Sequence, residues 1–214
     1  PQGVKIHALG KNAHASLPEG GINAIQGLLE LLYLLPLADC PSTRALRSMH
    51  ELFPFGDMWG KALGIAMEDE QSGVLTLNLG LMTLTGTGFT ASFDSRVPVC
   101  ANEDNCANVC KAAMAAKGIE VTTAWMMPAH IVEAGSPLVK TLLECYSTYT
   151  GVQDPQPIAI GGGTYVHNIP GGVAFGCEFP DFDPKMHSAN EQARVEDLMT
   201  SAKIFALAIA KLCG

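Results

Sequence analysis

Apolar and polar side chains recur along the first part of the chain with periods that predict two elements. Residues 4–9 alternate apolar and polar side chains, which is the period of a half-buried strand. Residues 25–35 carry a broad apolar stripe at helical spacing, and Pro36 ends it. Residues 44–53 contain only short helical patterns. The chain is therefore predicted to begin with a strand followed by a helix that packs on a sheet.

The next part predicts a hairpin, a helix and a further strand. Residues 73–84 and 88–97 are two strand candidates joined around a Gly-Thr-Gly turn, as in a hairpin. Residues 102–117 begin with acidic side chains and end just before a glycine, which is the polarity of a helix. Residues 119–126 predict another strand. The order over residues 4–126 is β-α-β-β-α-β, a ferredoxin-like α+β arrangement with two helices on one face of an antiparallel sheet.

The pattern changes after Pro128 into elements that are too few to close a core of their own. They are predicted helices at residues 137–149 and 194–212 and predicted short strands at residues 157–160 and 172–175. We expect these pieces to complete a sheet that begins elsewhere. The sequence thus predicts two domains of an α/β protein, at residues 1–128 and 129–214.

Composition excludes several classes of function. The 214 residues are 48% hydrophobic and 16% charged, enough to bury a core. A net charge of −8 without any Lys/Arg-rich run argues against nucleic acid and acidic membranes as partners. No apolar run reaches the roughly 18 residues that span a bilayer. The 7 cysteines are spread through predicted helices and strands rather than forming a compact disulfide pattern, so we expect a cytoplasmic protein.

His14 is the first candidate for chemistry, because it lies in a loop between the predicted strand and the first helix. An imidazole at such a position can donate a hydrogen bond to an oxyanion as charge develops. The alternative is a histidine whose ring is satisfied by the loop backbone. The residues alone favour that alternative.

Arg96 is the second candidate, at the end of an apolar strand. A guanidinium group can hold a substrate carboxylate through two parallel hydrogen bonds. The alternative is a surface arginine paired with Asp94, and without further information the residues favour it. A guanidinium for carboxylate binding therefore stays a hypothesis at this point.

The third candidate is the turn formed by Gly161, Gly162, Gly163 and Thr164 after a short predicted strand. Three glycines let backbone N–H groups approach an anion or a substrate terminus. The turn matches neither G-x-G-x-x-G nor the phosphate loop, since no Lys-Ser/Thr pair follows. A plain tight turn is an equal alternative, and anion binding without catalysis would need a basic neighbour that the sequence does not place there.

His187 is the fourth candidate, in a polar loop shortly before the last helix. A metal ligand at this position would be held by a rigid neighbour. One histidine is not a zinc site, and the sequence lacks the usual i, i+4 His pair, Cys-x-x-Cys pairs and an H-x-E arrangement. Cys106 and Cys110 are one helical turn apart and are interpreted as small buried apolar residues.

Taken in order, these segments resemble the aminoacylase and carnosinase superfamily of dinuclear zinc peptidases, most closely the bacterial dipeptidases of the peptidase V type. The matching segments are residues 10–24, 161–165, 174–180 and 187–191. In that family a catalytic domain holds two zinc ions, and an inserted ferredoxin-like lid closes over a short peptide. The resemblance implies that residues 1–128 are this lid and that residues 129–214 are the C-terminal part of the α/β catalytic domain.

The resemblance also implies roles for the candidate residues. His187 corresponds to the last metal ligand, and His14 to the lid histidine that polarises the scissile carbonyl. Arg96 corresponds to the lid arginine that holds the C-terminal carboxylate of the substrate, and residues 161–164 line the same carboxylate pocket. The implied activity is zinc-dependent hydrolysis of dipeptides or short peptides.

The sequence departs from the family in ways that limit this expectation. The family's other metal ligands and its general base belong to an N-terminal half, and part of the lid normally precedes Val4. We therefore expect a C-terminal fragment that is inactive alone and has that missing half as a partner. Val166 and His167 also replace the Ala-Arg pair common after Thr-Tyr. The competing interpretation is a non-catalytic ferredoxin-like module that forms a homodimer through its sheet.

Overall fold

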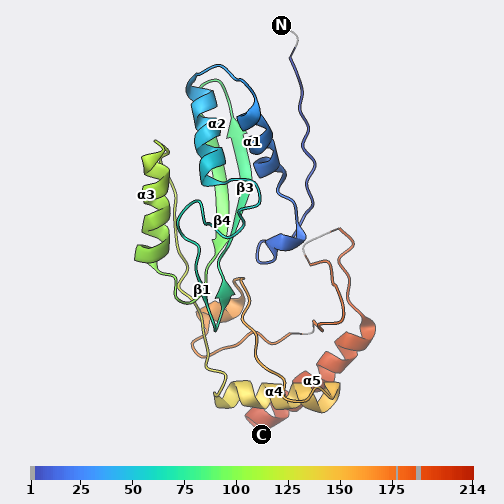
Figure 1. Ribbon diagram of the computed structural model, residues 1–214. Helices are drawn as coiled ribbons and strands as arrows, with labels where there is room; N and C mark the ends of the chain where they lie inside the picture. Colours follow the sequence, from blue (N-terminus) through green and yellow to red (C-terminus); the bar gives the residue numbers. More distant parts are fainter. Residues whose placement is uncertain (1–2, 177, 187–188) are drawn as a thin grey trace. The chain divides into compact units, whose positions relative to one another are not determined.

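The computed structural model describes residues 3–176, 178–186 and 189–214 (Figure 1). By its internal contacts the chain divides into two compact units. The first unit is Pro1–Ala129 with Ile160–Gly162, and the second is His130–Ala159 with Gly163–Gly214. The chain has the predicted mixed α/β character, with five α-helices and small antiparallel sheets among its described residues.

A β-hairpin is the centre of the first unit. Strand β3 (Thr76–Leu84) pairs antiparallel with strand β4 (Phe89–Arg96), and the register places Thr76 opposite Arg96. The register shifts once between Leu79 and Leu81. The two strands are joined at the predicted Gly-Thr-Gly turn, so the predicted hairpin is confirmed.

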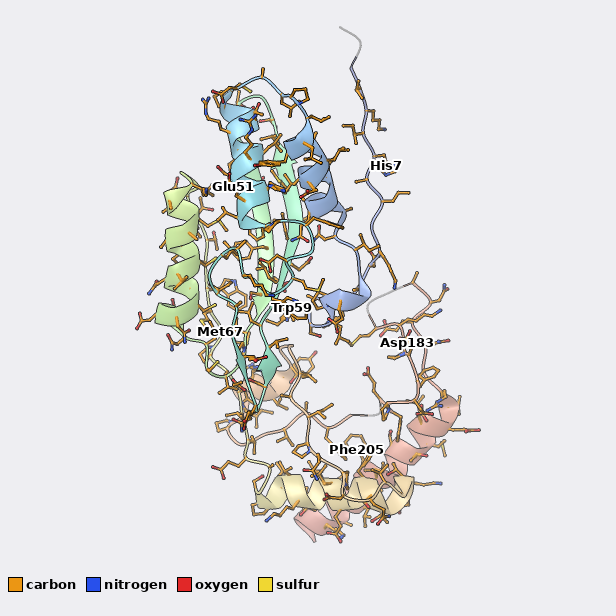
Figure 2. The ribbon with its side chains drawn as sticks, viewed as in Figure 1. His7, Glu51, Trp59, Met67, Asp183 and Phe205 are labelled. Carbon is orange, nitrogen blue, oxygen red and sulfur yellow. The ribbon has the colours of Figure 1, made fainter. Side chains whose placement is uncertain are left out.

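Three α-helices pack with this hairpin in the first unit (Figure 1). They are α1 (Ala24–Leu34), α2 (Pro41–Leu52) and α3 (Asn108–Ala116). A π-helical turn, Glu103–Ala107, leads into α3, and the side chain of Asn102 accepts hydrogen bonds from two main-chain N–H groups of that turn. Figure 2 shows Glu51 on the side of α2 that faces α3, where its carboxylate pairs with Lys117. The two helices predicted in this part of the chain are therefore confirmed.

One apolar core joins these elements. Side chains from α1, α2, β3 and α3, and from the loops between them, are buried together, and burial of this apolar area is what drives the assembly. Its members are Leu29, Met49, Leu52, Phe53, Leu63, Ile65, Leu75, Leu77, Leu79, Cys106, Cys110 and Met114. Cys106 and Cys110 thus occupy the buried positions predicted for them.

The two outer strands predicted for the ferredoxin-like sheet do not form. Residues 3–9 belong to no ladder, and Val4 and Leu9 are 89% and 81% exposed. Residues 119–126 also lack a strand, although Ile119 packs against the core. Alternating side chains favour a strand only where a neighbouring strand satisfies the main-chain groups. The structure therefore keeps the central α-β-β-α part of the predicted order.

A short two-stranded ribbon precedes the hairpin in the chain, and only its second strand falls within a range that was predicted as strand, residues 73–84. Strand β1 (Glu68–Asp69) pairs antiparallel with β2 (Gly73–Val74). The Asp69 carboxylate accepts hydrogen bonds from the main-chain N–H groups of Gln71, Ser72 and Cys100 and from the Ser72 hydroxyl. The turn is thus organised around one side chain.

The second unit is a pair of helices, α4 (Pro137–Thr150) and α5 (Val195–Cys213), with irregular chain between them. Both helices were predicted and are confirmed. Figure 2 labels Phe205 on α5, and its ring meets Phe175 edge-on at 5.4 Å between centroids. The buried apolar cluster between the two helices consists of Leu142, Cys145, Ile204 and Ala208.

The short strands predicted at residues 157–160 and 172–175 are wrong. Both segments are irregular, and the described part of the second unit contains no sheet for them to join. A 3₁₀ turn, Tyr165–Asn168, lies between them. Among the described residues, no helix has both the length and the apolar character needed to cross a membrane.

Candidate functional site

The loop that carries His14 is closed by a pair of main-chain hydrogen bonds. The N–H of Lys11 donates to the carbonyl of Ile22 at 3.0 Å, and the N–H of Ile22 donates back at 2.9 Å. Gly10 lies so close to this bridge that a Cβ there would sit 2.4 Å from the Ile22 oxygen. Only glycine permits that approach of two backbones. Gly10 therefore allows the two ends of the loop to approach each other.

The same loop is tied to strand β3 by side chains. The Thr76 hydroxyl donates to the carbonyl of Ala15 at 2.8 Å. The Asn23 amide donates to Asn78 Oδ1 at 3.0 Å and to the Leu79 carbonyl at 2.9 Å, while its oxygen accepts from two N–H groups in the first turn of α1. Asn23 thus joins the end of the loop, the start of a helix and the hairpin.

The ring of His14 is held from its Nδ1 side. Nδ1 lies 2.7 Å from Ser16 Oγ, and the Ser16 N–H donates to the same nitrogen at 3.3 Å. An Nδ1 that accepts from a backbone N–H is unprotonated, so the neutral ring carries its proton on Nε2. The loop therefore supplies the contacts that the alternative interpretation expected, and it leaves His14 in a tautomer that donates through Nε2.

Arg96 forms the ion pair that the alternative interpretation proposed. Arg96 Nη2 lies 2.8 Å from Asp94 Oδ2. The arginine side chain is nonetheless only 33% exposed, and its Nε is buried without a hydrogen-bond partner in the described structure. A buried N–H group without an acceptor is unusual in proteins. Arg96 is therefore more enclosed than an ordinary surface arginine.

Four polar side chains share one face of the hairpin at this end. Thr76 lies opposite Arg96, and Asn78 lies opposite Asp94. Side chains two residues apart on a strand point to the same face. This is the face to which Thr76 and Asn78 tie the His14 loop, so the loop and the ion pair lie on the same side of the sheet.

Gly161 is close to both the loop and the arginine. A Cβ built on Gly161 would lie 3.1 Å from the Cβ atoms of both Arg96 and Ser16. Nothing lies within 4 Å of the corresponding position on Gly162. Three segments that are far apart in the sequence therefore meet in the first unit, and Ser16 links this contact to the ring of His14.

Two more of the predicted residues belong to the second unit. Gly163 and Thr164 belong to the second unit, where the Thr164 N–H donates to His167 Nδ1 at 3.2 Å. In the same unit His130 Nε2 lies 2.6 Å from the Gly172 carbonyl, and the rings of His130 and His167 are 5.4 Å apart. No spacing pattern in the sequence indicated this pair of histidines.

The predicted metal ligand His187 lies outside the described residues. Across residues 3–176, 178–186 and 189–214, no group of three or more His, Cys, Asp and Glu side chains could hold a metal ion. A zinc ion needs at least three protein ligands from such residues. The described residues therefore do not by themselves supply a zinc ligand set.

Two side chains outside this cluster have pKa values that are shifted by their structural surroundings. Burial raises the pKa of the Cys110 thiol to about 11, which keeps it protonated and unreactive. In the second unit, two hydrogen bonds from Arg194 lower the pKa of the Asp181 carboxyl. Arg194 also donates to Asp197 at the start of α5, so it holds the preceding loop against that helix.

A helix-backed hairpin that brings together a histidine loop, an arginine and Gly161 defines a mixed α/β domain with small antiparallel sheets. Comparison with known proteins agrees with this class. The model of the family described as the peptidase dimerisation domain matches residues 2–204, and the chain belongs to that family. The family resemblance predicted from the sequence motifs is confirmed.

Two curated relatives illustrate the match. The chain is 36% identical over 208 residues to the protein named "Putative dipeptidase YtjP" of Bacillus subtilis (strain 168), covering 97% of this chain and 44% of that protein. It is 29% identical over 205 residues to "Putative dipeptidase SSP1012" of Staphylococcus saprophyticus, covering 95% of this chain and 43% of that protein. The chain thus spans less than half the length of these relatives.

Proposed function

We propose that this chain is the substrate-holding lid and C-terminal part of a zinc-dependent dipeptidase. The observation that supports the proposal most directly is the contact of Gly161 with both Ser16 and Arg96. It joins in one compact unit three segments to which the family resemblance assigns roles in substrate binding or catalysis. The names of the curated relatives support hydrolysis of dipeptides as the activity of the whole protein.

Arg96 is proposed to bind the C-terminal carboxylate of the peptide. The Cβ and Cγ atoms of its side chain lie against Gly161, the first residue of the triple-glycine turn. A charge-assisted pair of N–H bonds is the strongest carboxylate contact that a protein side chain offers. The main chain of Gly161 and Gly162 is proposed to line the same pocket, and Gly163 and Thr164 are proposed to extend it.

His14 is proposed to stabilise the developing oxyanion on the scissile carbonyl. Ser16 holds the ring through Nδ1, so that Nε2 is the ring nitrogen that carries the proton. A preorganised donor of this kind stabilises charge as it appears, at no further cost in orientation. His14 thus acts through hydrogen bonding, and the chain's own contribution is to bind and orient the peptide.

We further propose that zinc supplies the water activation and that most of its ligands come from the rest of the longer protein. His187 is the one ligand proposed from this chain. The chain alone is then inactive, and it needs the complementary N-terminal half. The six cysteines that the structure describes are free, which supports a reducing, cytoplasmic location.

The test is steady-state kinetics of the longer protein with a dipeptide substrate. Arg96→Ala should raise KM by about 10–100-fold with a small change in kcat, because a hydrogen bond to a charged group is lost from the bound states. His14→Ala should lower kcat by about 100-fold or more with little change in KM. Arg44→Ala is the matched control, since Arg44 forms an exposed ion pair of similar length, 2.9 Å, with Asp39. Equal, small effects of all three substitutions would remove both roles.

Homodimer formation is a second candidate function, and it is compatible with the first. Leu34 on α1 and Leu81 on β3 are 70% and 71% exposed, and the described β3–β4 sheet has no further strand at either edge. Exposed apolar side chains next to open strand edges favour association with another chain. Sedimentation of the purified chain should show a concentration-dependent dimer that Leu34→Lys and Leu81→Lys together weaken. A chain that stays monomeric at high concentration would contradict this function.

A further inference from the structure

Arg96 is already engaged by a carboxylate from its own strand. Asp94 lies two residues before it on the same face of β4, and Asp94 Oδ2 is 2.8 Å from Arg96 Nη2. Both side chains are partly exposed, at 46% for Asp94 and 33% for Arg96. The pair therefore stands where a ligand can reach it.

The enclosed Nε of Arg96 limits how a second carboxylate can approach. Nε is buried, and the Cβ and Cγ atoms of the arginine lie against Gly161. The donors left for an incoming carboxylate are the two Nη groups at the end of the guanidinium. A carboxylate that binds both Nη groups must share Nη2 with Asp94 or displace Asp94 from it.

We propose that Asp94 is a specificity-determining residue that competes with the substrate's C-terminal carboxylate for Arg96. This inference rests on the proposed function of Arg96. Two carboxylates beside one guanidinium repel each other, so Asp94 weakens the binding of every peptide with a free C-terminus. The penalty is larger for peptides whose C-terminal residue is Asp or Glu, because these bring a second negative charge to the same place.

The neighbouring contacts support a competing role over a scaffolding one. Asn78, opposite Asp94 on β3, is held by Asn23, and Thr76, opposite Arg96, is held by Ala15. The hairpin face is therefore organised by contacts that do not involve the Asp94 carboxylate. Removing its charge should leave that face in place and change what Arg96 is free to bind.

The experiment compares Asp94→Asn with the wild-type longer protein in dipeptide hydrolysis. KM should fall by about 2–5-fold for an alanine-terminated dipeptide, which is the size of an exposed ion pair, with kcat unchanged. The fall should be larger for a dipeptide that ends in Glu. Asp39→Asn is the matched control, because it removes a carboxylate from a comparable exposed pair with Arg44. Thermal unfolding of each variant chain shows whether the fold is retained.

The possible outcomes distinguish failure of the inference about Asp94 from failure of the proposed function of Arg96. A lower KM in Asp94→Asn alone, greatest for the Glu-terminated peptide, supports competition. A higher KM in Asp94→Asn overturns it and makes Asp94 a positioning residue for the guanidinium. An unchanged KM in Asp94→Asn, with a raised KM in Arg96→Ala, also overturns the inference but leaves the proposed function standing. An unchanged KM in Arg96→Ala removes the proposed function itself, and the inference with it.

Discussion

Gly161 lies against Arg96 so closely that a single added methyl group would sit 3.1 Å from the arginine Cβ. The same methyl group would also sit 3.1 Å from the Ser16 Cβ. This is tighter than an ordinary carbon–carbon contact, so at least one of the neighbours would have to move. Gly161→Ala should therefore destabilise the first unit by about 1 kcal/mol and displace Arg96. In the longer protein we expect this substitution to raise KM several-fold. Urea unfolding of the chain measures the accompanying loss of stability.

Gly162→Ala is the control that the chain itself offers. At Gly162, the adjacent position, nothing lies within 4 Å of the added Cβ, and the chemical change is the same as at Gly161. It should leave both unfolding and KM nearly unchanged. If Gly161→Ala and Gly162→Ala behave alike, the contact of Gly161 with Arg96 and Ser16 does not form in solution.

Asn23 connects the candidate loop to the rest of the first unit, so its removal should be costly. Asn23→Ala loses the cap of α1 and the two hydrogen bonds to β3, which together predict a loss of about 2–3 kcal/mol in the free energy of unfolding. Asn23→Asp keeps the capping oxygen but cannot donate to Asn78 or Leu79. It should therefore retain the helix by circular dichroism and lose stability through the tether alone. If Asn23→Ala loses less than about 0.5 kcal/mol, the loop is not anchored in this way.

Local patterns made the helices and the hairpin predictable, and long-range pairing explains most of what was missed. The helix over residues 25–35 and the hairpin turn depend on apolar spacing and glycines close in sequence. The outer strands at residues 4–9 and 119–126 depend on a partner strand, which the alternation of side chains does not reveal. The same distinction applies to the two mispredicted strands after residue 150.

The candidate site shows the same division between local and distant information. The pairing of Arg96 with Asp94 was predictable, because the two residues lie on one face of one strand. The contact of Gly161 with Ser16 was not predictable from spacing, because the chain folds back over more than a hundred residues to make it. The roles of His14 and Arg96 stay predictions until the longer protein is assayed.

Acid should destabilise the ribbon of β1 and β2 through Asp69. Hydrogen bonds, chiefly from the Ser72 N–H, lower the pKa of this carboxyl to about 2, against 3.8 for an unperturbed aspartate. A group with a lowered folded-state pKa contributes stability that is complete above pH 4 and is lost as the pH falls through about 2. The urea midpoint of the wild-type chain should therefore fall between pH 4 and 2, and Asp69→Asn should fall less over that window.

Glu70 supplies the comparison for this pH dependence. Its side chain is exposed and is not among the hydrogen-bond partners of Asp69. Glu70→Gln should therefore keep the wild-type slope between pH 4 and 2. Parallel slopes for wild type and Asp69→Asn would show that the network around Asp69 contributes nothing to acid stability.

The pairing of α4 with α5 holds the second unit, and its core is small enough that one residue should decide its stability. Ile204 is 3% exposed and packs in the cluster with Leu142 and Cys145, whereas Ile209 on the same helix is 62% exposed. Ile204→Ala should cost about 2–4 kcal/mol, because it removes buried methyl groups and leaves a cavity. Ile209→Ala makes the same chemical change at the surface and should stay within about 0.5 kcal/mol of wild type. Amide hydrogen exchange of α4 and α5 is the measurement of choice, because it reports the second unit separately from the first. Faster exchange confined to Ile204→Ala would support this packing, and equal protection in both variants would mean that the two helices do not pack through this face.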